Sequence, residues 1–138
     1  MNNFEISLKN RKARIIPINI IRAKSLIVSS EEAIKNAKEI SLIEGKQKTI
    51  LRELYEGLRQ LCEAVGYSKG YQFFDHESIT FFLKEVLKEE IISAKFDRYR
   101  KLRNGINYYG NELSLITVKE SLKEIPHLVR ELKKYFSN

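Results

Sequence analysis

Between residues 46 and 66, apolar side chains recur at a spacing that leaves little choice of local structure. Alternating steps of three and four residues connect Leu51, Leu54, Leu58, Leu61 and Val65. This spacing places the side chains on one face of an α-helix, and such a face is stable when it is buried against other helices. We predict a helix over residues 46–64 that ends at Gly66. Gly57 inside it either permits a close helix crossing or has no special role.

Similar spacing predicts one helix before this segment and a shorter one after it. The first begins near Pro17, which suits a first helical turn, and extends to about residue 44. Residues 29–32 have the spacing of a capping box and can divide this segment, but we favour one continuous helix. The short helix begins after Asp75, whose side chain can accept a hydrogen bond from the first turn.

Two further helices are predicted in the last third of the chain. One covers residues 88–109 and ends at Gly110. Its apolar arc consists of Ile91, Ile92, Tyr99, Leu102, Ile106 and Tyr109. The other begins with a capping box at residues 117–120 and is expected to kink at Pro126.

The chain has six glycines and two prolines, which is little turn chemistry for an extended sheet, and we expect no strands. Five amphipathic helices with short connections predict an all-α fold, an up-and-down bundle of four to five helices. We assign residues 17–138 to a single helical-bundle domain. Residues 1–16 are left as a basic, partly flexible N-terminal segment.

Charge favours an anionic partner. The net charge is +7 and the isoelectric point is near 9.5, which attracts polyanions without selecting one. The single cysteine, Cys62, excludes an internal disulfide, and its place in an apolar stripe favours a core residue over a reactive thiol. No apolar run reaches the roughly 18 residues that span a bilayer, and no signal-peptide pattern is found. The expected location is the cytoplasm, without a membrane partner.

Residues 66–74 are predicted to form a loop that carries four aromatic side chains and a lysine. The aromatic residues are Tyr67, Tyr71, Phe73 and Phe74. They either cover one end of the bundle, which we favour, or form a surface on which bases stack.

The two histidines are the only side chains whose unperturbed pKa suits proton transfer at neutral pH. We expect His76 to make a local hydrogen bond at the start of the short helix, in preference to acting as a ligand or base. His127 is expected near the surface of the last helix. The sequence has no histidine spacing typical of zinc sites and no glycine-rich phosphate loop, dinucleotide turn or nucleophile elbow. We therefore expect no metal and no cofactor.

The residues best suited to bind a phosphate lie near the end of the helix over residues 88–109. One polar stripe holds Arg100, Arg103, Asn104 and Asn107. A guanidinium offers phosphate oxygens a forked and permanently charged donor. Alternatively, these side chains pair with glutamates of a neighbouring helix, such as Glu53 or Glu56. The spacing does not choose between the two.

Residues 99–110, YRKLRNGINYYG, resemble the end of the penultimate helix in HEPN-domain proteins. The resemblance extends to residues 52–59, 70–71 and 75–77, and the order of helices agrees from about residue 17. It implies a helical bundle that forms a homodimer, often beside a small nucleotidyltransferase partner. Many such proteins are metal-independent ribonucleases or toxins with an Arg-x(4–6)-His motif. In that motif the arginine stabilises the scissile phosphate and the histidine assists attack by the ribose 2′-hydroxyl.

Carried over to this chain, the resemblance assigns the phosphate contact to Arg103 and the polar residue after it to Asn104. Tyr108 occupies the position of the histidine, and a phenol with an unperturbed pKa near 10 is a poor base at neutral pH. Loss of general base catalysis typically costs about 10²- to 10⁴-fold in rate. The candidate catalytic residues are thus Arg103, Asn104 and Tyr108. The candidate nucleic-acid contacts are Arg100, Lys101, Arg103 and Asn107.

Three functions are compatible with this pattern, and whether the protein is an enzyme is left open. The favoured one is a dimer that binds RNA or a nucleotide, with nuclease activity weakened or lost, in a toxin–antitoxin or stress-response system. The second is an active metal-independent ribonuclease in which Tyr108 or a displaced histidine, such as His76, completes the site. The third is a structural partner of a nucleotidyltransferase whose Arg103 makes intersubunit ion pairs.

Overall fold

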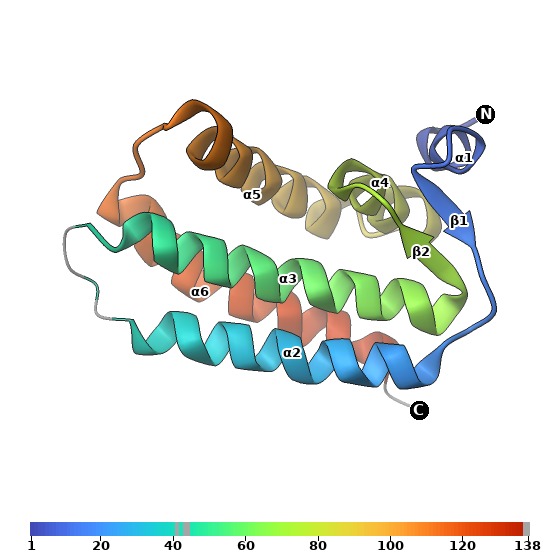
Figure 1. Ribbon diagram of the computed structural model, residues 1–138, viewed down its shortest axis with the longest axis horizontal. Helices are drawn as coiled ribbons and strands as arrows, with labels where there is room; N and C mark the ends of the chain where they lie inside the picture. Colours follow the sequence, from blue (N-terminus) through green and yellow to red (C-terminus); the bar gives the residue numbers. More distant parts are fainter. Residues whose placement is uncertain (41, 43–44, 137–138) are drawn as a thin grey trace.

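A computed structural model describes residues 1–40, 42 and 45–136 and consists mainly of long helices (Figure 1). In chain order the elements are α1 (Asn3–Lys9), β1 (Ala13–Ile15), α2 (Ile20–Glu39), α3 (Gln47–Lys69), β2 (Tyr71–Phe73), α4 (His76–Phe81), α5 (Glu90–Tyr109) and α6 (Leu115–Leu132). A π-helical turn, Phe82–Val86, prolongs α4, and a 3-10 turn, Lys133–Phe136, prolongs α6. The predicted all-α class is confirmed, with two short strands added.

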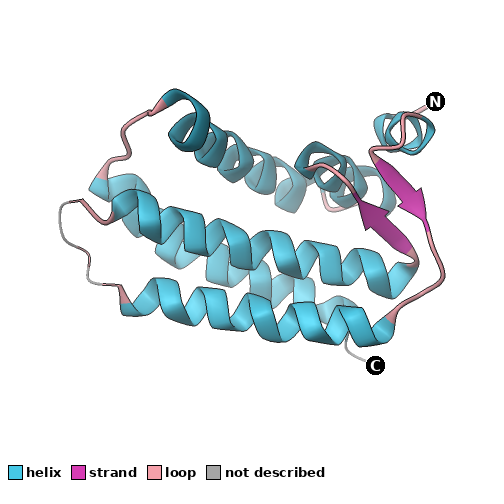
Figure 2. Cartoon of the chain, in the orientation of Figure 1, coloured by secondary structure: helices cyan, strands magenta, loops and turns pink. Residues whose placement is uncertain are grey.

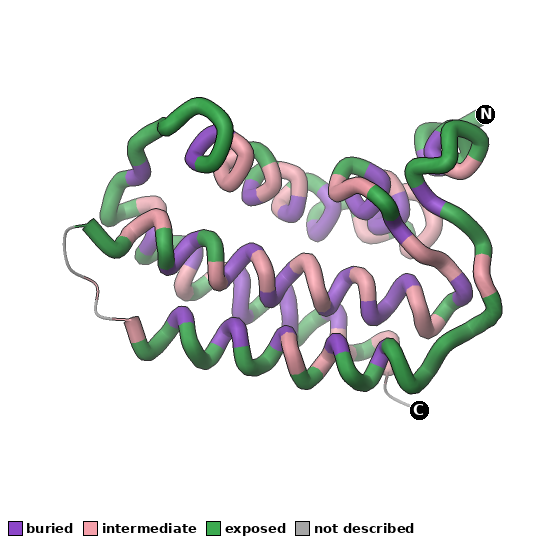
Figure 3. The backbone as a smooth tube through the Cα atoms, in the orientation of Figure 1, coloured by how far each residue is buried: buried purple, intermediate pink, exposed green. Residues whose placement is uncertain are grey.

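The core is organised around α3. Helices α2 and α6 pack along it, and Figure 3 shows buried positions over its whole length. The predicted stripe from Leu51 to Val65 is fully buried. The predicted end of this helix is wrong, because α3 passes through Gly66 and stops at Gly70, whose φ of 90° suits a helix C-cap. At Gly66 a Cβ would lie 2.5 Å from Cε2 of Phe73, so the glycine admits this ring.

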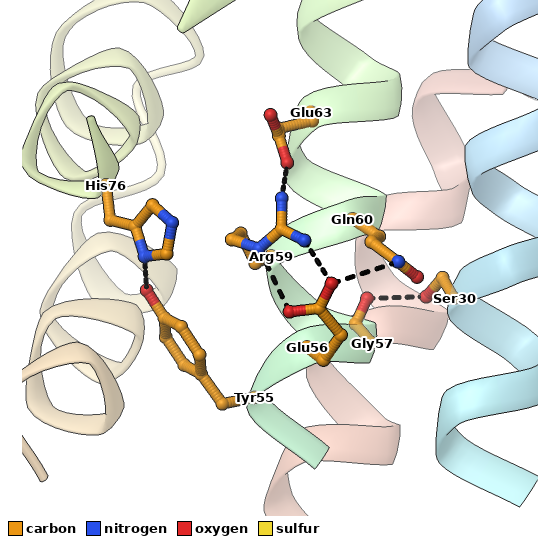
Figure 4. Close-up of polar contacts among 8 residues, drawn as sticks. All are labelled: Ser30, Tyr55, Glu56, Gly57, Arg59, Gln60, Glu63 and His76. Carbon is orange, nitrogen blue, oxygen red and sulfur yellow. Dashed lines mark hydrogen bonds and ion pairs between the residues drawn. The ribbon is translucent and has the colours of Figure 1, made fainter. Parts of the chain in front are cut away.

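Helices α2 and α3 cross closely at Gly57. A Cβ there would lie 2.8 Å from Cδ1 of Ile34 and 3.0 Å from the carbonyl oxygen of Ser30. The buried hydroxyl of Ser30 donates a hydrogen bond of 2.6 Å to the Gly57 carbonyl, as Figure 4 shows. Of the two interpretations of Gly57, the structure supports the close crossing.

Helix α2 is continuous from Ile20 to Glu39, as the single-helix interpretation predicts. It begins three residues later than predicted, because Asn19 caps it by accepting a hydrogen bond from the Arg22 backbone N–H. The predicted end near residue 44 is wrong, because α2 stops at Glu39 and the backbone of its C-cap, Ile40, is extended. Residues 41, 43 and 44 lie outside the described residues.

The first sixteen residues belong to the same folded unit, so the boundary placed at residue 17 does not coincide with an edge of the fold. Strand β1 pairs antiparallel with β2, with Ala13 opposite Phe73, and the expectation of no strands is wrong here (Figure 2). The Glu85 carboxylate accepts hydrogen bonds from the backbone N–H groups of Asn3 and Phe4, at 3.0 and 2.6 Å. It thereby caps the positive end of α1.

An aromatic cluster lies under this N-terminal segment. The buried ring of Phe4 is 5.4 Å from that of Tyr71 and 5.7 Å from that of Phe82, measured between centroids. Phe73 packs on Phe82 at 5.1 Å. Tyr71 and Phe73 therefore cover one end of the bundle, as favoured from the sequence, whereas Phe74 is exposed.

The last two helices depart from the predictions at their surfaces and ends. Helix α5 ends at Gly110 as predicted, but Ile91 and Tyr109 of its apolar arc are 71% and 79% exposed rather than buried. Helix α6 begins earlier than the predicted capping box, because Ser114 accepts a hydrogen bond from the Thr117 backbone N–H. The helix continues through Pro126.

Replacing Gly57 with alanine should destabilise the protein. Overpacking against Ile34 and the Ser30 backbone costs about 1–3 kcal/mol, more than the roughly 1 kcal/mol that alanine gains in a helix. Urea unfolding should give a lower midpoint for Gly57→Ala. Gly105→Ala is the matched control, because its Cβ would meet only the exposed Asn111 side chain, which can move away. A Gly57→Ala midpoint at or above wild type would contradict the close crossing.

Candidate functional site

Helices α3 and α5 run antiparallel and bring the predicted polar stripe against α3. Near one end, Arg52 Nε donates a hydrogen bond of 2.7 Å to Asn107 Oδ1. One turn further along α3, the guanidinium of Arg103 lies over the ring of Tyr55, 5.7 Å from its centroid. The next contact joins Tyr55 to Phe96, with ring centroids 5.7 Å apart. As residue numbers rise on α3 they fall on α5, and Tyr55 contacts residues from two different turns of α5, Arg103 and Phe96.

Carboxylates hold two of the neighbouring arginines. Arg59 pairs with Glu56 and Glu63 of its own helix, as Figure 4 shows. Arg100 pairs with Asp97 at 2.7 Å and with Glu77 at 3.8 Å. These two guanidinium groups are therefore largely neutralised.

Asp97 also binds Lys101, at 3.1 Å. Burial opposes the ionisation of Asp97, but its hydrogen bonds to Arg100 and Lys101 outweigh burial and lower the pKa of its carboxyl. The alternative considered from the sequence, pairing of the stripe with glutamates of a neighbouring helix, is found in part, because Arg100 pairs with Glu77 of α4. No pair with Glu53 or Glu56 occurs within the part of the chain that the structure describes.

Arg103 differs from these two arginines. Among residues 1–40, 42 and 45–136, it forms no ion pair with a carboxylate. Its hydrogen bond goes to the neutral amide oxygen of Asn104 at 3.4 Å, which is long. Its side chain is partly exposed. The positive charge of Arg103 is thus free to meet an anion.

Arg52 is a second cation, and its sequence pattern alone did not mark it as a site residue. It binds the neutral Asn107, and no carboxylate pairs with it among the described residues. A signal was present, because Arg52, Tyr55 and Arg59 recur at helical spacing within residues 52–59, which carry part of the HEPN resemblance.

His76, the first residue of α4, lies beside the same cluster. Its Nδ1 is 2.8 Å from the hydroxyl oxygen of Tyr55 (Figure 4). The expectation of a local hydrogen bond is wrong, because this partner comes from α3. The local cap is made by Asp75, which accepts from the Ser78 backbone N–H at 2.9 Å, as predicted.

The surroundings of His76 keep it neutral. Burial, followed by the positive charges of Arg59 and Arg103, lowers the pKa of His76 to about 4. Burial raises the pKa of Tyr55 further above neutrality, so that its phenol keeps the proton. At neutral pH the pair is therefore an uncharged imidazole joined to an uncharged phenol, next to the free charge of Arg103.

Tyr108 does not join this group. Five residues after Arg103 on the same helix, it is turned by about 140° around the helix axis, and its side chain is 70% exposed. Lys101 is mainly exposed and directed to Asp97. His127 lies on the surface, as expected, and pairs with Glu131 at 2.9 Å. Of the proposed site residues, the structure thus brings Arg103 and Asn107 against α3, with Asn104 bonded to Arg103. Arg100 is directed instead to Asp97 and to Glu77 of α4.

In comparisons with known proteins, no protein-family model and no curated sequence matches the chain at a significant level. Within the described residues, no group of three acidic, histidine or cysteine side chains could hold a metal ion. None of the helices in the described part is long and apolar enough to cross a membrane.

The arrangement of Arg52 and Arg103 defines a site that can bind an anion.

The low pKa of His76 should make folding stability depend on pH. The unfolded chain takes up a proton near pH 6.5 and the folded chain only near pH 4. The free energy of unfolding should therefore fall as pH is lowered through this window. Thermal melts should show a smaller decline for His76→Gln than for wild type, while His127→Gln keeps the wild-type decline. Equal declines for His76→Gln and wild type would contradict a buried neutral His76.

Proposed function

We propose that this protein is a HEPN-like helical bundle that binds RNA or a nucleotide through phosphate, with Arg103 as the central contact. One observation carries the proposal: Arg103 is the guanidinium of the α3–α5 contact that lies over Tyr55 without a carboxylate among the described residues. A partly buried charge without a counterion is unfavourable, and a phosphate oxygen would compensate it with charge-assisted hydrogen bonds.

Neighbouring groups support a nucleic-acid strand as the ligand. Arg52 and Asn107 lie one helical turn from Arg103, roughly 5 Å along the axis, and offer a second cation and an amide. Asn104 is bonded to Arg103 and Arg100 lies one turn before it on α5, whereas Lys101, two residues before Arg103, lies on another face of the helix and pairs with Asp97. The net charge of +7 would speed the encounter with a polyanion.

Binding without efficient cleavage is the favoured activity. Tyr108, which stands in place of the motif histidine, faces away from Arg103, and a phenol is a poor base at neutral pH. On the resemblance, we propose a role as a toxin–antitoxin or stress-response component, in the cytoplasm that the sequence leads us to expect. A nucleotidyltransferase subunit is the proposed partner.

An active metal-independent ribonuclease is the second candidate, and the position of His76 favours it. This imidazole is bonded to the tyrosine over which Arg103 lies. It could therefore take the part of the displaced histidine. Its low pKa makes it a weak base, which argues for slow cleavage.

A homodimer is part of the proposal, and exposed apolar side chains at the end of α5 and the start of α6 support it. Tyr108 and Tyr109 at the end of α5 and Leu115 and Ile116 at the start of α6 are all exposed. Exposed apolar groups of this size are typical of interaction surfaces.

Replacing Arg103 with alanine should weaken RNA binding by at least about tenfold, the effect of losing a hydrogen bond to a charged group. The salt dependence should lose about 0.7 in logarithmic slope, because one phosphate contact is removed from a single strand. Fluorescence anisotropy with labelled oligouridylate measures both, and uridine monophosphate as competitor separates strand from nucleotide binding. Arg98→Ala is the matched control, because Arg98 lies on α5 but pairs with Glu120 and Glu124. An equal loss of RNA affinity in Arg103→Ala and Arg98→Ala would contradict the proposal.

The same variants separate binding from cleavage. Incubated with RNA in EDTA, wild type should leave the strands intact, as expected for a site without an efficient base. Wild-type products with 2′,3′-cyclic phosphate ends that are absent with Arg103→Ala would instead establish the ribonuclease. If neither binding nor cleavage depends on Arg103, the protein is a structural partner.

Placing a charge in the apolar patch should dissociate the proposed dimer. In analytical ultracentrifugation, wild type should sediment as a dimer and Ile116→Asp as a monomer, because an unpaired buried carboxylate is strongly unfavourable. Ile21→Asp is the matched control, since Ile21 is also an exposed isoleucine but lies on α2. A wild-type monomer at all accessible concentrations would exclude the dimer.

A further inference from the structure

Only one of the two ring nitrogens of His76 has a hydrogen-bond partner among the described residues. Nδ1 faces the Tyr55 hydroxyl at 2.8 Å, whereas Nε2 has no hydrogen-bond partner within the described part of the chain. In Figure 4 the second ring nitrogen is turned away from Tyr55, on the side of Arg59. The imidazole is only partly buried, so an external ligand can reach it.

The hydrogen-bond partner of Nδ1 determines whether Nε2 carries the proton of the neutral imidazole. The Tyr55 phenol keeps its proton, and His76 Nδ1 is the acceptor found within hydrogen-bond distance of it. A buried hydroxyl donates wherever an acceptor is available, so Tyr55 O–H donates to Nδ1. A neutral imidazole that accepts at Nδ1 carries its proton at Nε2. Tyr55 therefore makes Nε2–H a donor that points away from Tyr55.

The charges around His76 favour an anion at this donor. From α3 it faces Tyr55, Arg59 and Glu56, and from α5 it faces Arg103. On its own helix Asp75 is committed to the cap of α4, and Glu77 to Arg100 of α5. The two arginines are the largest charge effects on the imidazole, and both disfavour a further positive charge there until an anion arrives.

We propose that His76 is the second phosphate ligand of this site: its Nε2–H donates to an oxygen of the phosphodiester that Arg103 holds, and the imidazole takes up a proton as that phosphate binds. This inference rests on the proposed binding of phosphate at Arg103. The proton comes from solvent and adds to Nδ1, and the Tyr55 hydroxyl turns to accept the new N–H. The bound state is then an imidazolium and a guanidinium on one phosphate.

This role differs from that of a ribonuclease base. A base would need a lone pair at Nε2, whereas the hydrogen bond from Tyr55 puts a proton there. Tyr55 acts as a positioning residue, because it reaches the phosphate only through the orientation and tautomer of His76. The site would thus recognise the phosphodiester by two donors from two different helices, α4 and α5.

Proton uptake predicts that affinity rises as pH falls. Binding of labelled oligouridylate should tighten several-fold between about pH 7.5 and about pH 5.5, and by no more than about tenfold per pH unit for one proton. Uracil and the phosphodiester keep the same charge over this range, so the titrating group belongs to the protein. His76→Gln retains an amide donor and should bind with little pH dependence, whereas His127→Gln should follow wild type. Circular dichroism checks that each variant is folded.

A second measurement needs no ligand. In ¹⁵N NMR of the free protein, His76 should appear as the neutral tautomer with the proton at Nε2, and Tyr55→Phe should change the tautomer balance. Tyr55→Phe should also weaken binding at neutral pH, because nothing then holds Nε2–H towards the phosphate.

The outcomes separate the two proposals. Binding that requires Arg103 but keeps its pH dependence in His76→Gln overturns the role of His76 alone. A proton at Nδ1 in the free wild-type protein has the same consequence and favours the ribonuclease. Binding that is absent, or indifferent to Arg103→Ala, overturns the phosphate site and the role of His76 together.

Discussion

Helix α3 is buried around most of its circumference, so its polar side chains must find partners on neighbouring elements or within the helix itself. The ring of Tyr55 belongs to the core, and its hydroxyl is met by His76 of α4. Arg59 is met by two glutamates of α3, and the Gly57 carbonyl by Ser30 of α2. The hydrogen bond from Ser30 to Gly57 helps to hold α2 against α3, and the contact of His76 with Tyr55 helps to hold α4 there. The second contact also brings His76 near Arg103, which lies over the same tyrosine.

Periodicity was sufficient for the body of the fold because each long helix buries one continuous face. Periodicity failed to predict where helices end and where the short strands lie, because a few individual contacts determine these features. Gly66 reads as a stop signal, yet the packing of Phe73 on its bare backbone keeps it inside α3, and Gly70 ends the helix instead. Strand β1 has three residues, too few for an alternating pattern, and it exists because β2 lies beside it.

The candidate site shows the same limit at the level of single side chains. Arg103 could be selected from sequence, since a helical stripe and a family resemblance both point to it. Tyr108 was selected by its distance along the chain, and the helical turn carries it to another face. Contacts between α3, α4 and α5 bring Tyr55, His76 and Arg52 into the site, and the local spacing of residues does not reveal such contacts.

The carboxylate cap on α1 has a consequence for the order in which the fold is completed. Glu85 lies 82 residues beyond the Asn3 backbone N–H that it accepts from. During synthesis the first helix therefore emerges long before its cap, its paired strand and the rings that cover Phe4. Contacts between α2 and α3 are closer in sequence and cost less loop entropy. We therefore expect α1 and β1 to dock after the hairpin of α2 and α3 has formed.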